Sequence, residues 1–455
     1  VDVTTNTNGS IEAQSAAAAV AIGGGGNAGI ALAGGGANSF NTITGSTIAQ
    51  INDVNLTDGL APNSTASSGD VTVSADESST IDSSVQAVSA SIAIGIDVGV
   101  ALSIGVGLAR NFIGETQGNA GLSGGSPQAY QAANGGQGNQ VIAKVSNSTV
   151  KRRSKLSVTS VNASNLRSDV ESVAAALAGG STAGVALTGA GSETTNRSRV
   201  NVLASVDGGE TLNNLIQISE TLTVTATDQS TARNVSVGAA VSASFAGPQG
   251  GSVAGSLGVS LARNTINNAV STNLSNLVEG SRVGALTVKA NKTKADGQNY
   301  NFEATSAAVS VSVSVSLVGI ALAGGGGDAF NTALGNTTTA LTNVNLTSSG
   351  PIAIDSENTQ TADAGVGVGA LAVGSGGAAA VGVVNAQNLL GVDSTDSTAQ
   401  RAQVKTSVTN STLMADQAIA INSASSASYE VLALPVSVAV AGAAAGAGAG
   451  AINNS

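Results

Sequence analysis

The chain contains no cysteine, histidine or tryptophan, and only 2% of its 455 residues are aromatic. Without cysteine it has no disulfide framework and no thiolate nucleophile. Without histidine it lacks the most common acid–base side chain and a common zinc ligand. Paired carboxylates remain as candidates, but Asp82, Asp97 and Asp169 occupy unrelated places in the repeats of the sequence. We therefore expect no catalytic, cofactor-binding or metal site, and no enzymatic activity.

Charged residues are also scarce, at 10% of the chain, whereas an average soluble protein has roughly 25%. The 28 acidic and 17 basic residues give a net charge of −11. This balance disfavours nucleic-acid binding, which needs a basic face and stacking aromatics. The dense basic run from Lys151 to Lys155 could bind an anionic polymer or a cell surface. A solvated loop edge before the strand at Leu156 is the interpretation we prefer.

Membrane-spanning strands show aromatic girdles and alternate apolar with polar residues. This chain has few aromatics, and its long runs alternate large with small residues. We therefore expect it not to span a membrane.

What the chain does have is a repeat. A strand-like pentad of alternating large and small or polar residues occurs seven times, with starts 70, 85, 66, 64, 66 and 67 residues apart. Such a period is typical of stacked supersecondary units that cannot bury their apolar faces alone. The pentads are VDVTT at Val1, VTVSA at Val71, LSVTS at Leu156, LTVTA at Leu222, LTVKA at Leu286, IAIDS at Ile352 and IAINS at Ile419.

The pentads divide the chain into seven units. The second is lengthened by a Gly/Gln/Asn-rich segment, 116–140, which we expect to project as a loop. The first pentad begins at residue 1 and the seventh unit stops early, so we expect a fragment of a longer array. The units are 1–70, 71–155, 156–221, 222–285, 286–351, 352–418 and the partial unit 419–455.

A long run of alternating large and small residues follows each pentad. In the second unit Ile94, Val100 and Leu102 share one parity, and glycine, alanine and serine dominate the other. A period of two indicates strands. We predict that the large residues face a dry core. The glycine clusters Gly23 to Gly26 and Gly324 to Gly327 lack the features of phosphate loops and predict tight turns and close approach of the backbone.

An asparagine motif closes each run. Since stacked asparagines form amide ladders in β-arrays, we predict such a ladder here. The asparagines are Asn41, Asn111, Asn264, Asn331, Asn385 and Asn453, with Asn196 as the counterpart in the third unit.

Together these patterns predict an all-β fold: an elongated repeat rod, most simply a parallel β-solenoid (β-helix). A unit of about 66 residues would divide into three coils of roughly 22. No capping unit is visible, and unpaired strand edges favour self-association into a filament.

Calcium remains an alternative at one loop, through Asp53, Asp58 and Asp70, although the calcium-binding nonapeptide pattern is absent.

The pentads, Gly/Ala-rich runs and Asn motifs resemble the repetitive regions of giant bacterial surface exoproteins, including filamentous-haemagglutinin-like adhesins. The resemblance is one of rhythm and composition over the whole chain. It implies a secreted, extracellular structural protein or adhesin forming a surface fibre at the bacterial cell surface, with a cell surface or polysaccharide as partner. The alternative is the rod segment of a secreted repetitive toxin whose activity lies outside this chain.

Overall fold

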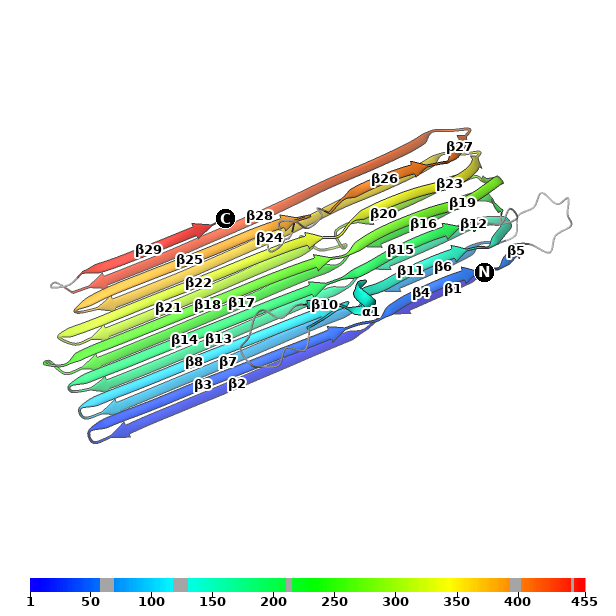
Figure 1. Cartoon of the computed structure of the whole chain (residues 1–455). Coiled ribbons are helices and arrows are strands. Elements are labelled where there is room, and N and C mark those ends of the chain that lie inside the picture. The colour runs from blue at the N-terminus through cyan, green and yellow to red at the C-terminus, as the bar shows by residue number, and fades with distance from the viewer. Residues whose placement is uncertain (58–68, 118–129, 210–214, 393–401, 443–445, 455) are drawn as a thin grey trace.

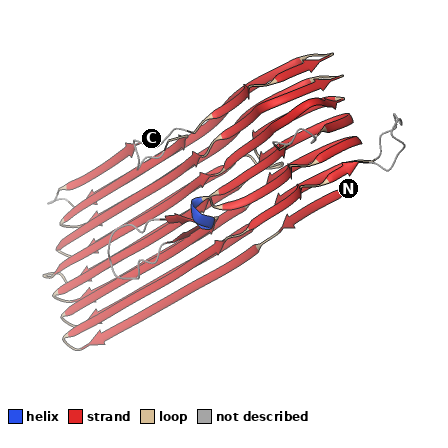
Figure 2. Cartoon of the chain, turned by 45° about the vertical axis from the view of Figure 1, so that its right-hand side comes forward, coloured by secondary structure: helices blue, strands red, loops and turns tan. Residues whose placement is uncertain are grey.

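The structure is a computed structural model that describes residues 1–57, 69–117, 130–209, 215–392, 402–442 and 446–454. Within these residues the chain forms 29 strands and one four-residue helix, α1 (Ala133–Gly136). Figure 2 shows how completely strands make up the fold. The predicted all-β parallel solenoid is confirmed.

Each unit makes one broad turn of the solenoid (Figure 1). In the second unit β6 (Val71–Glu77) leads into a long hairpin, β7 (Thr80–Gly95) and β8 (Val98–Ile113). The chain then returns along β11 (Asn139–Ser146) to β12 (Thr149–Asn162), which opens the third unit. We call the part built by the hairpin arms the flange, and the part built by the opening and return strands the lobe.

The same elements recur along the chain. The opening strands are β1 (Asp2–Thr7), β6, β12, β16 (Ile216–Asp228), β20 (Ala285–Lys292), β24 (Ile352–Gly374) and β28 (Ile419–Ala441), of which the last two continue into the first hairpin arm. The separate first arms are β2 (Ser10–Gly25), β7, β13 (Asn165–Gly180), β17 (Thr231–Ala246) and β21 (Phe302–Val315).

The remaining strands complete the coils. The second arms are β3 (Ala28–Ile43), β8, β14 (Ala183–Ser198), β18 (Gly251–Asn267), β22 (Val318–Leu334), β25 (Gly377–Leu390) and β29 (Ala447–Asn454). The return strands are β4 (Ser46–Asn52) with β5 (Asn55–Thr57), β11, β15 (Val200–Asp207), β19 (Ala269–Val283), β23 (Thr337–Ser348), and β26 (Val404–Thr409) with β27 (Thr412–Ala415).

Successive units pair in parallel with their pentads in register. Leu156 lies beside Val71 of the preceding unit and Leu222 of the following one. One unit therefore forms one coil, and the prediction of three short coils per unit was wrong. The long run supplies two straight arms of about 16 residues and no additional corners. Coils spaced by about 4.8 Å stack to about 30 Å for seven units, whereas one such arm is about 53 Å long. Axial length thus depends on how many coils stack.

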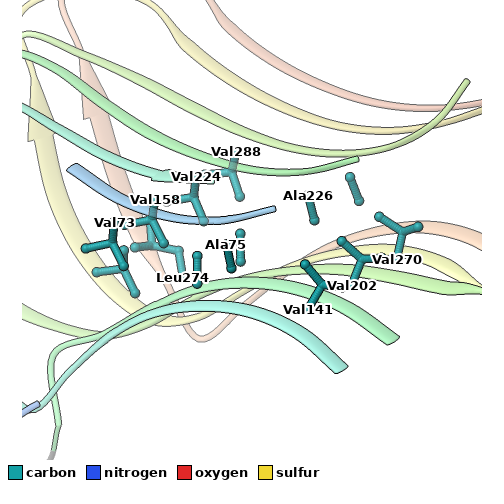
Figure 3. Close-up of a cluster of buried hydrophobic side chains, with 14 of the residues drawn as sticks. Val73, Ala75, Val141, Val158, Val202, Val224, Ala226, Val270, Leu274 and Val288 are labelled. Atoms are coloured by element: carbon teal, nitrogen blue, oxygen red, sulfur yellow. The ribbon is translucent and has the colours of Figure 1, made fainter. Parts of the chain in front are cut away.

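The lobe is filled by aliphatic side chains (Figure 3). Val73, Val158 and Val224 on the opening strands are fully buried, and so are Val141 and Val202 on the return strands of the same core. Each such side chain contributes about 1.5–3 kcal/mol relative to its exposed state. This stacked aliphatic core holds successive coils together.

The flange has the opposite arrangement from the one predicted. Ala93 and Ser103 are fully buried between the two arms, whereas Ile94 is 61% exposed. Val100 and Leu102 also point outward, on the opposite face of the flange from Ile94, and are partly exposed. The prediction that Ile94, Val100 and Leu102 form a dry core was therefore wrong: the small parity faces inward.

Close approach of the two arms explains this inversion. A Cβ atom on Gly238 of β17 would lie only 2.5 Å from the carbonyl oxygen of Val259 in the facing arm. Hydroxyl groups meet directly across the gap, as between Ser252 and Ser314 at 2.7 Å. Larger side chains do not fit there, so alternation turns them outward.

The two glycine clusters behave differently. Gly23 to Gly25 end β2, and Gly26 belongs to the turn that follows, as predicted. Gly324 to Gly327 lie inside β22, paired with Leu257 to Ser260 of β18, so the predicted turn there was wrong. The close approach holds, because a Cβ atom on Gly325 would lie 2.5 Å from the Val368 side chain of the facing arm. Strand pairing on both sides keeps this stretch extended.

The insertion of the second unit is described only in part. Residues 118–129 of the expected projecting loop, 116–140, lie outside the described residues. Before and after them β9 (Glu115–Gln117) and β10 (Tyr130–Ala132) pair antiparallel and lead to α1. Asn139 and Gln140 already belong to β11 and to the solenoid wall.

Candidate functional site

A row of polar side chains, buried in all but the first and last coils, crosses the stack where the lobe meets the flange. Each member lies six residues after the start of its pentad and pairs in register with its neighbours. We call this set the buried polar row. Its members are Thr7, Glu77, Asn162, Asp228, Lys292, Asn358 and Ser425.

Glu77 is 3% exposed, and Asn139 and Ser79 donate hydrogen bonds to its Oε1, each at 3.1 Å. Burial raises the pKa of the Glu77 carboxyl above its usual value, and the nearby charge of Asp228 acts in the same direction. The two hydrogen bonds oppose this effect. The buried carboxyl group of Glu77 is therefore stabilised by one amide and one hydroxyl donor, which compensate a negative charge less fully than a cation would.

Asp228, two coils further on, accepts hydrogen bonds from the side-chain amides of two asparagines. The Asn162 amide donates to its Oδ1 at 2.7 Å, and the Asn268 amide donates to its Oδ2 at 3.1 Å. The backbone N–H of Ser230 also donates to Oδ1 at 3.2 Å. These charge-assisted bonds offset much of the cost of burying the carboxylate.

Lys292 follows Asp228 in the row and is 1% exposed. Its Nζ donates to the carbonyl oxygens of Leu334 at 3.1 Å and Gly335 at 2.8 Å. Burial lowers the pKa of Lys292 to about 8, and the charge of Asp228 acts in the opposite direction.

The central members of the buried polar row, from Glu77 to Lys292, are closed to solvent and cannot meet a substrate. Its chemistry suits a structural role in fixing strand register. If one coil slipped by a residue, Asp228 or Lys292 would lose its donors or acceptors inside the protein, which is costly. Sequence reasoning missed this row, although the constant offset from the pentads was a usable signal.

The predicted asparagine ladder is present in two runs inside the flange. Amide bonds join Asn41 to Asn111 at 2.9 Å and Asn111 to Asn196 at 3.1 Å. In the later coils 2.8 Å bonds join Asn264 to Asn331 and Asn331 to Asn388.

The sixth unit contributes a different asparagine from the one predicted. Asn388 continues the ladder, whereas Asn385 pairs with Asp328 and donates to its carboxylate at 3.2 Å. Asn453 lies beside Val384 and donates to the carbonyl oxygen of Ala433. The predictions for Asn385 and Asn453 were wrong because the ladder follows strand register rather than the local sequence motif.

Of the three acidic residues considered for catalysis, two lie beside the same arginine and the third lies apart. Asp82 pairs in register with Arg167 on an outer face, and Asp169 forms an ion pair with the same arginine at 2.7 Å. Asp97 lies at the far hairpin turn. Among the described residues no three acidic side chains gather as a metal site would require.

The residues considered for calcium also have other contacts. Asp53 has a positive φ of 57° and accepts a hydrogen bond from the amide of Asn147. The carbonyl oxygen of Asp70 accepts a bond from the N-terminal amino group at 2.8 Å. Asp58 lies outside the described residues.

The basic run from Lys151 to Lys155 lies within β12 rather than on a loop edge, so that interpretation was wrong. It coincides with two register shifts against β16, and Arg152 has a φ of 55°. Lys155 is 3.6 Å from Glu220. The bulge interrupts the regular pairing of β12 with β16 within this basic run.

Comparisons with known proteins identify no relative: no family model, no curated protein and no solved structure matches the chain. In the part of the chain that the structure describes, no helix has the length and apolar character needed to cross a membrane.

Proposed function

We propose that this chain is a structural or adhesive repeat protein that builds an extracellular surface fibre by stacking coils axially. The in-register parallel stack carries this proposal. The proposal fits a chain with no cysteine and few charges, whose stability comes from repeated strand pairing.

Both ends of the described stack present strand edges for further pairing. On the first coil β2 pairs with β7, and on the last described coil β28 pairs with β24. The opposite edges of β2 and β28 have no strand beside them in the described residues. Another coil could add there with the same hydrogen-bond pattern as inside the stack.

The outer face of the lobe provides a surface for contact with a cell surface or polysaccharide. Ser74, Thr159 and Thr225 form a row along it, and Thr159 donates to Ser74 at 3.2 Å. Asn422 donates to Asp355 at 2.9 Å further along the same row. Rows of hydroxyl, amide and carboxylate groups at strand spacing suit the repeating hydroxyl groups of a polysaccharide.

Electron microscopy and fibre diffraction of the purified chain test this function. We expect filaments with an axial reflection at about 4.8 Å. Isolated, monodisperse particles at high concentration would contradict the proposal.

One backbone position offers a matched variant for this test. The Ile352 N–H donates a hydrogen bond to the carbonyl oxygen of Ala418. In this parallel pair the carbonyl of Ala418 and the N–H of Ala420 therefore face β24, whereas the N–H of Ile421 faces the open edge. Ile421→Pro should therefore remove an edge donor without breaking the pairing to β24, and should reduce filament growth. Ile421→Val keeps the donor and should assemble like the original chain.

A further inference from the structure

The flange carries a continuous apolar zone on both outer faces. On the first arms one outward row contains Val20, Val241 and Val311, and the next contains Ile22, Ile92 and Val313. The exposure of these side chains reaches 72% at Val20 and 77% at Ile22. On the second arms Leu32, Leu187 and Leu322 form a corresponding row. Exposed apolar surfaces of this extent mark contact sites.

Charge is almost absent from this zone. It comprises 18–36, 88–106, 173–191, 239–259, 309–326, 369–383 and 436–450. Of the chain's 28 acidic and 17 basic residues, only Asp97 lies in these segments, at a hairpin turn. The other described turns contain polar or small residues such as Asn27, Ser181 and Ser375.

The apolar zone ends at the same height on both faces, at a belt of ion pairs around Arg233 and Arg263. We call this belt the charged collar. Asn234, next to Arg233 in β17, donates to the carbonyl oxygen of Arg263 in β18 at 2.6 Å, so the two arginines lie opposite one another. Ion pairs lie along each face: Arg233 with Glu303 at 3.5 Å, and Arg263 with Asp328 at 2.7 Å.

We propose that the flange enters the acyl-chain layer of a lipid membrane, with its turns leading and the charged collar held at the headgroups. An immersed element must be apolar on both faces down to one common level, which is the arrangement found here. The nine residues from Val88 to Ile96 extend about 30 Å, similar to the thickness of a bilayer's hydrocarbon core.

The interior of the flange suits this environment. Several of its inward serines hydrogen-bond across the two arms, as Ser256 does with Ser310 at 2.8 Å, so these hydroxyls face away from lipid. Backbone groups of the inner coils are paired on both sides; β7, for example, lies between β2 and β13. The inference rests on the proposed axial stacking only for the two outermost edges, which added coils would cover.

The shape of the faces favours lipid over a second copy of the chain. On the second arms glycines interrupt the aliphatic rows, and Leu187, Gly255, Leu257, Leu322 and Gly324 line an open recess. Fluid acyl chains fill such an uneven surface, whereas dry pairing of two sheets needs matched shapes. Contact with a second copy of the chain would also not require the charged collar to lie at the same height on both faces of the flange.

Tryptophan fluorescence tests the proposal, because the chain has no native tryptophan. Ile94→Trp and Leu187→Trp place a reporter on each outer face of the flange, and Thr223→Trp places a control on the lobe. With phosphatidylcholine vesicles we expect a blue shift for both flange variants and strong quenching by brominated acyl chains. The Thr223→Trp emission should change little.

Two outcomes would overturn the proposal. A blue shift that depends on protein concentration alone, without quenching by brominated lipid, would show that another copy covers the flange. Emission unchanged by vesicles at both flange positions would show that lipid does not contact it. Circular dichroism confirms that each variant is folded. Electron microscopy of the same samples scores filament formation separately, so failure of lipid binding and failure of axial stacking are distinguishable.

Discussion

Ser256 of β18 and Ser310 of β21 share a 2.8 Å hydrogen bond across the flange, while Leu257 and Val309, the adjoining residues, face outward. Leu257 is 53% exposed and Val309 is 43% exposed. Polar groups are thus paired inside a thin layer, and aliphatic groups cover it. This inversion distinguishes the flange from the lobe and underlies the first prediction.

Enlarging an inward residue of the flange should be more harmful than truncating its outward neighbour. Ala178 is fully buried and Leu177 is 37% exposed. We expect Ala178→Leu to destabilise the protein by about 1–3 kcal/mol, because the facing arms leave no room. Leu177→Ala should change stability by less than about 1 kcal/mol. Urea unfolding of both variants checks this, and the reverse order would refute the inverted packing.

Removing one rung of the asparagine ladder should cost more than removing an exposed asparagine. Asn264 is 1% exposed and donates to Asn331 and to the carbonyl oxygen of Glu303, each at 2.8 Å. Asn264→Ala leaves these acceptors unpaired, so we expect a loss of about 1–3 kcal/mol. Exposed Asn38→Ala serves as the control. Equal unfolding midpoints would mean that the ladder adds no stability.

Lys292 should make the protein more stable as pH rises through the alkaline range. Its pKa is about 8 in the folded chain, whereas the ordinary value for a lysine is 10.5. Between these values the unfolded state binds more protons, so stability increases with pH by up to about 3 kcal/mol. Unfolding from pH 7 to 11 measures this rise, and Lys292→Met should lack it. Identical profiles would contradict the placement of a buried lysine.

Glu77 should have the opposite effect at lower pH. Because burial raises its pKa, the folded state holds this proton more tightly, and stability falls as pH rises above about 4.5 through the raised pKa. Glu77→Gln keeps an acceptor oxygen for Asn139 and removes the charge. We therefore expect the variant to be more stable than the original chain at pH 7. A less stable variant would show that the carboxylate is favourably paired.

The sequence was sufficient to predict the features that depend on repetition. The pentads that begin at Leu156 and Leu222 have the same pattern, and the structure places them side by side. The Asn41 and Asn111 motifs likewise identified members of the amide ladder. Parallel in-register stacking brings equivalent residues together whatever path the coil takes, so these predictions did not require knowledge of that path.

The features that depend on the path of one coil were not predictable in the same way. Alternation shows that Ala93 and Ile94 face opposite sides but not which side is inside, and large aliphatic residues are usually the buried ones. The decisive facts are distances between arms, such as the close approach at Gly238, and these depend on how the hairpin folds. The exchange of Asn385 for Asn388 has the same origin in strand register.

The central claim is that one unit of about 66 residues forms one broad coil, and spin-label distances test it most directly. The chain has no native cysteine, so label pairs can be placed at Thr159 with Thr225, or at Thr159 with Ser181. The structure pairs Thr159 with Thr225, about 5 Å apart between strands, and places Ser181 at the far turn beyond the 16-residue β13, roughly 50 Å from the start of that arm. We predict strong dipolar broadening for the first pair and a long distance for the second. Close approach of Thr159 to Ser181, 22 residues apart as in a three-coil unit, would contradict the account.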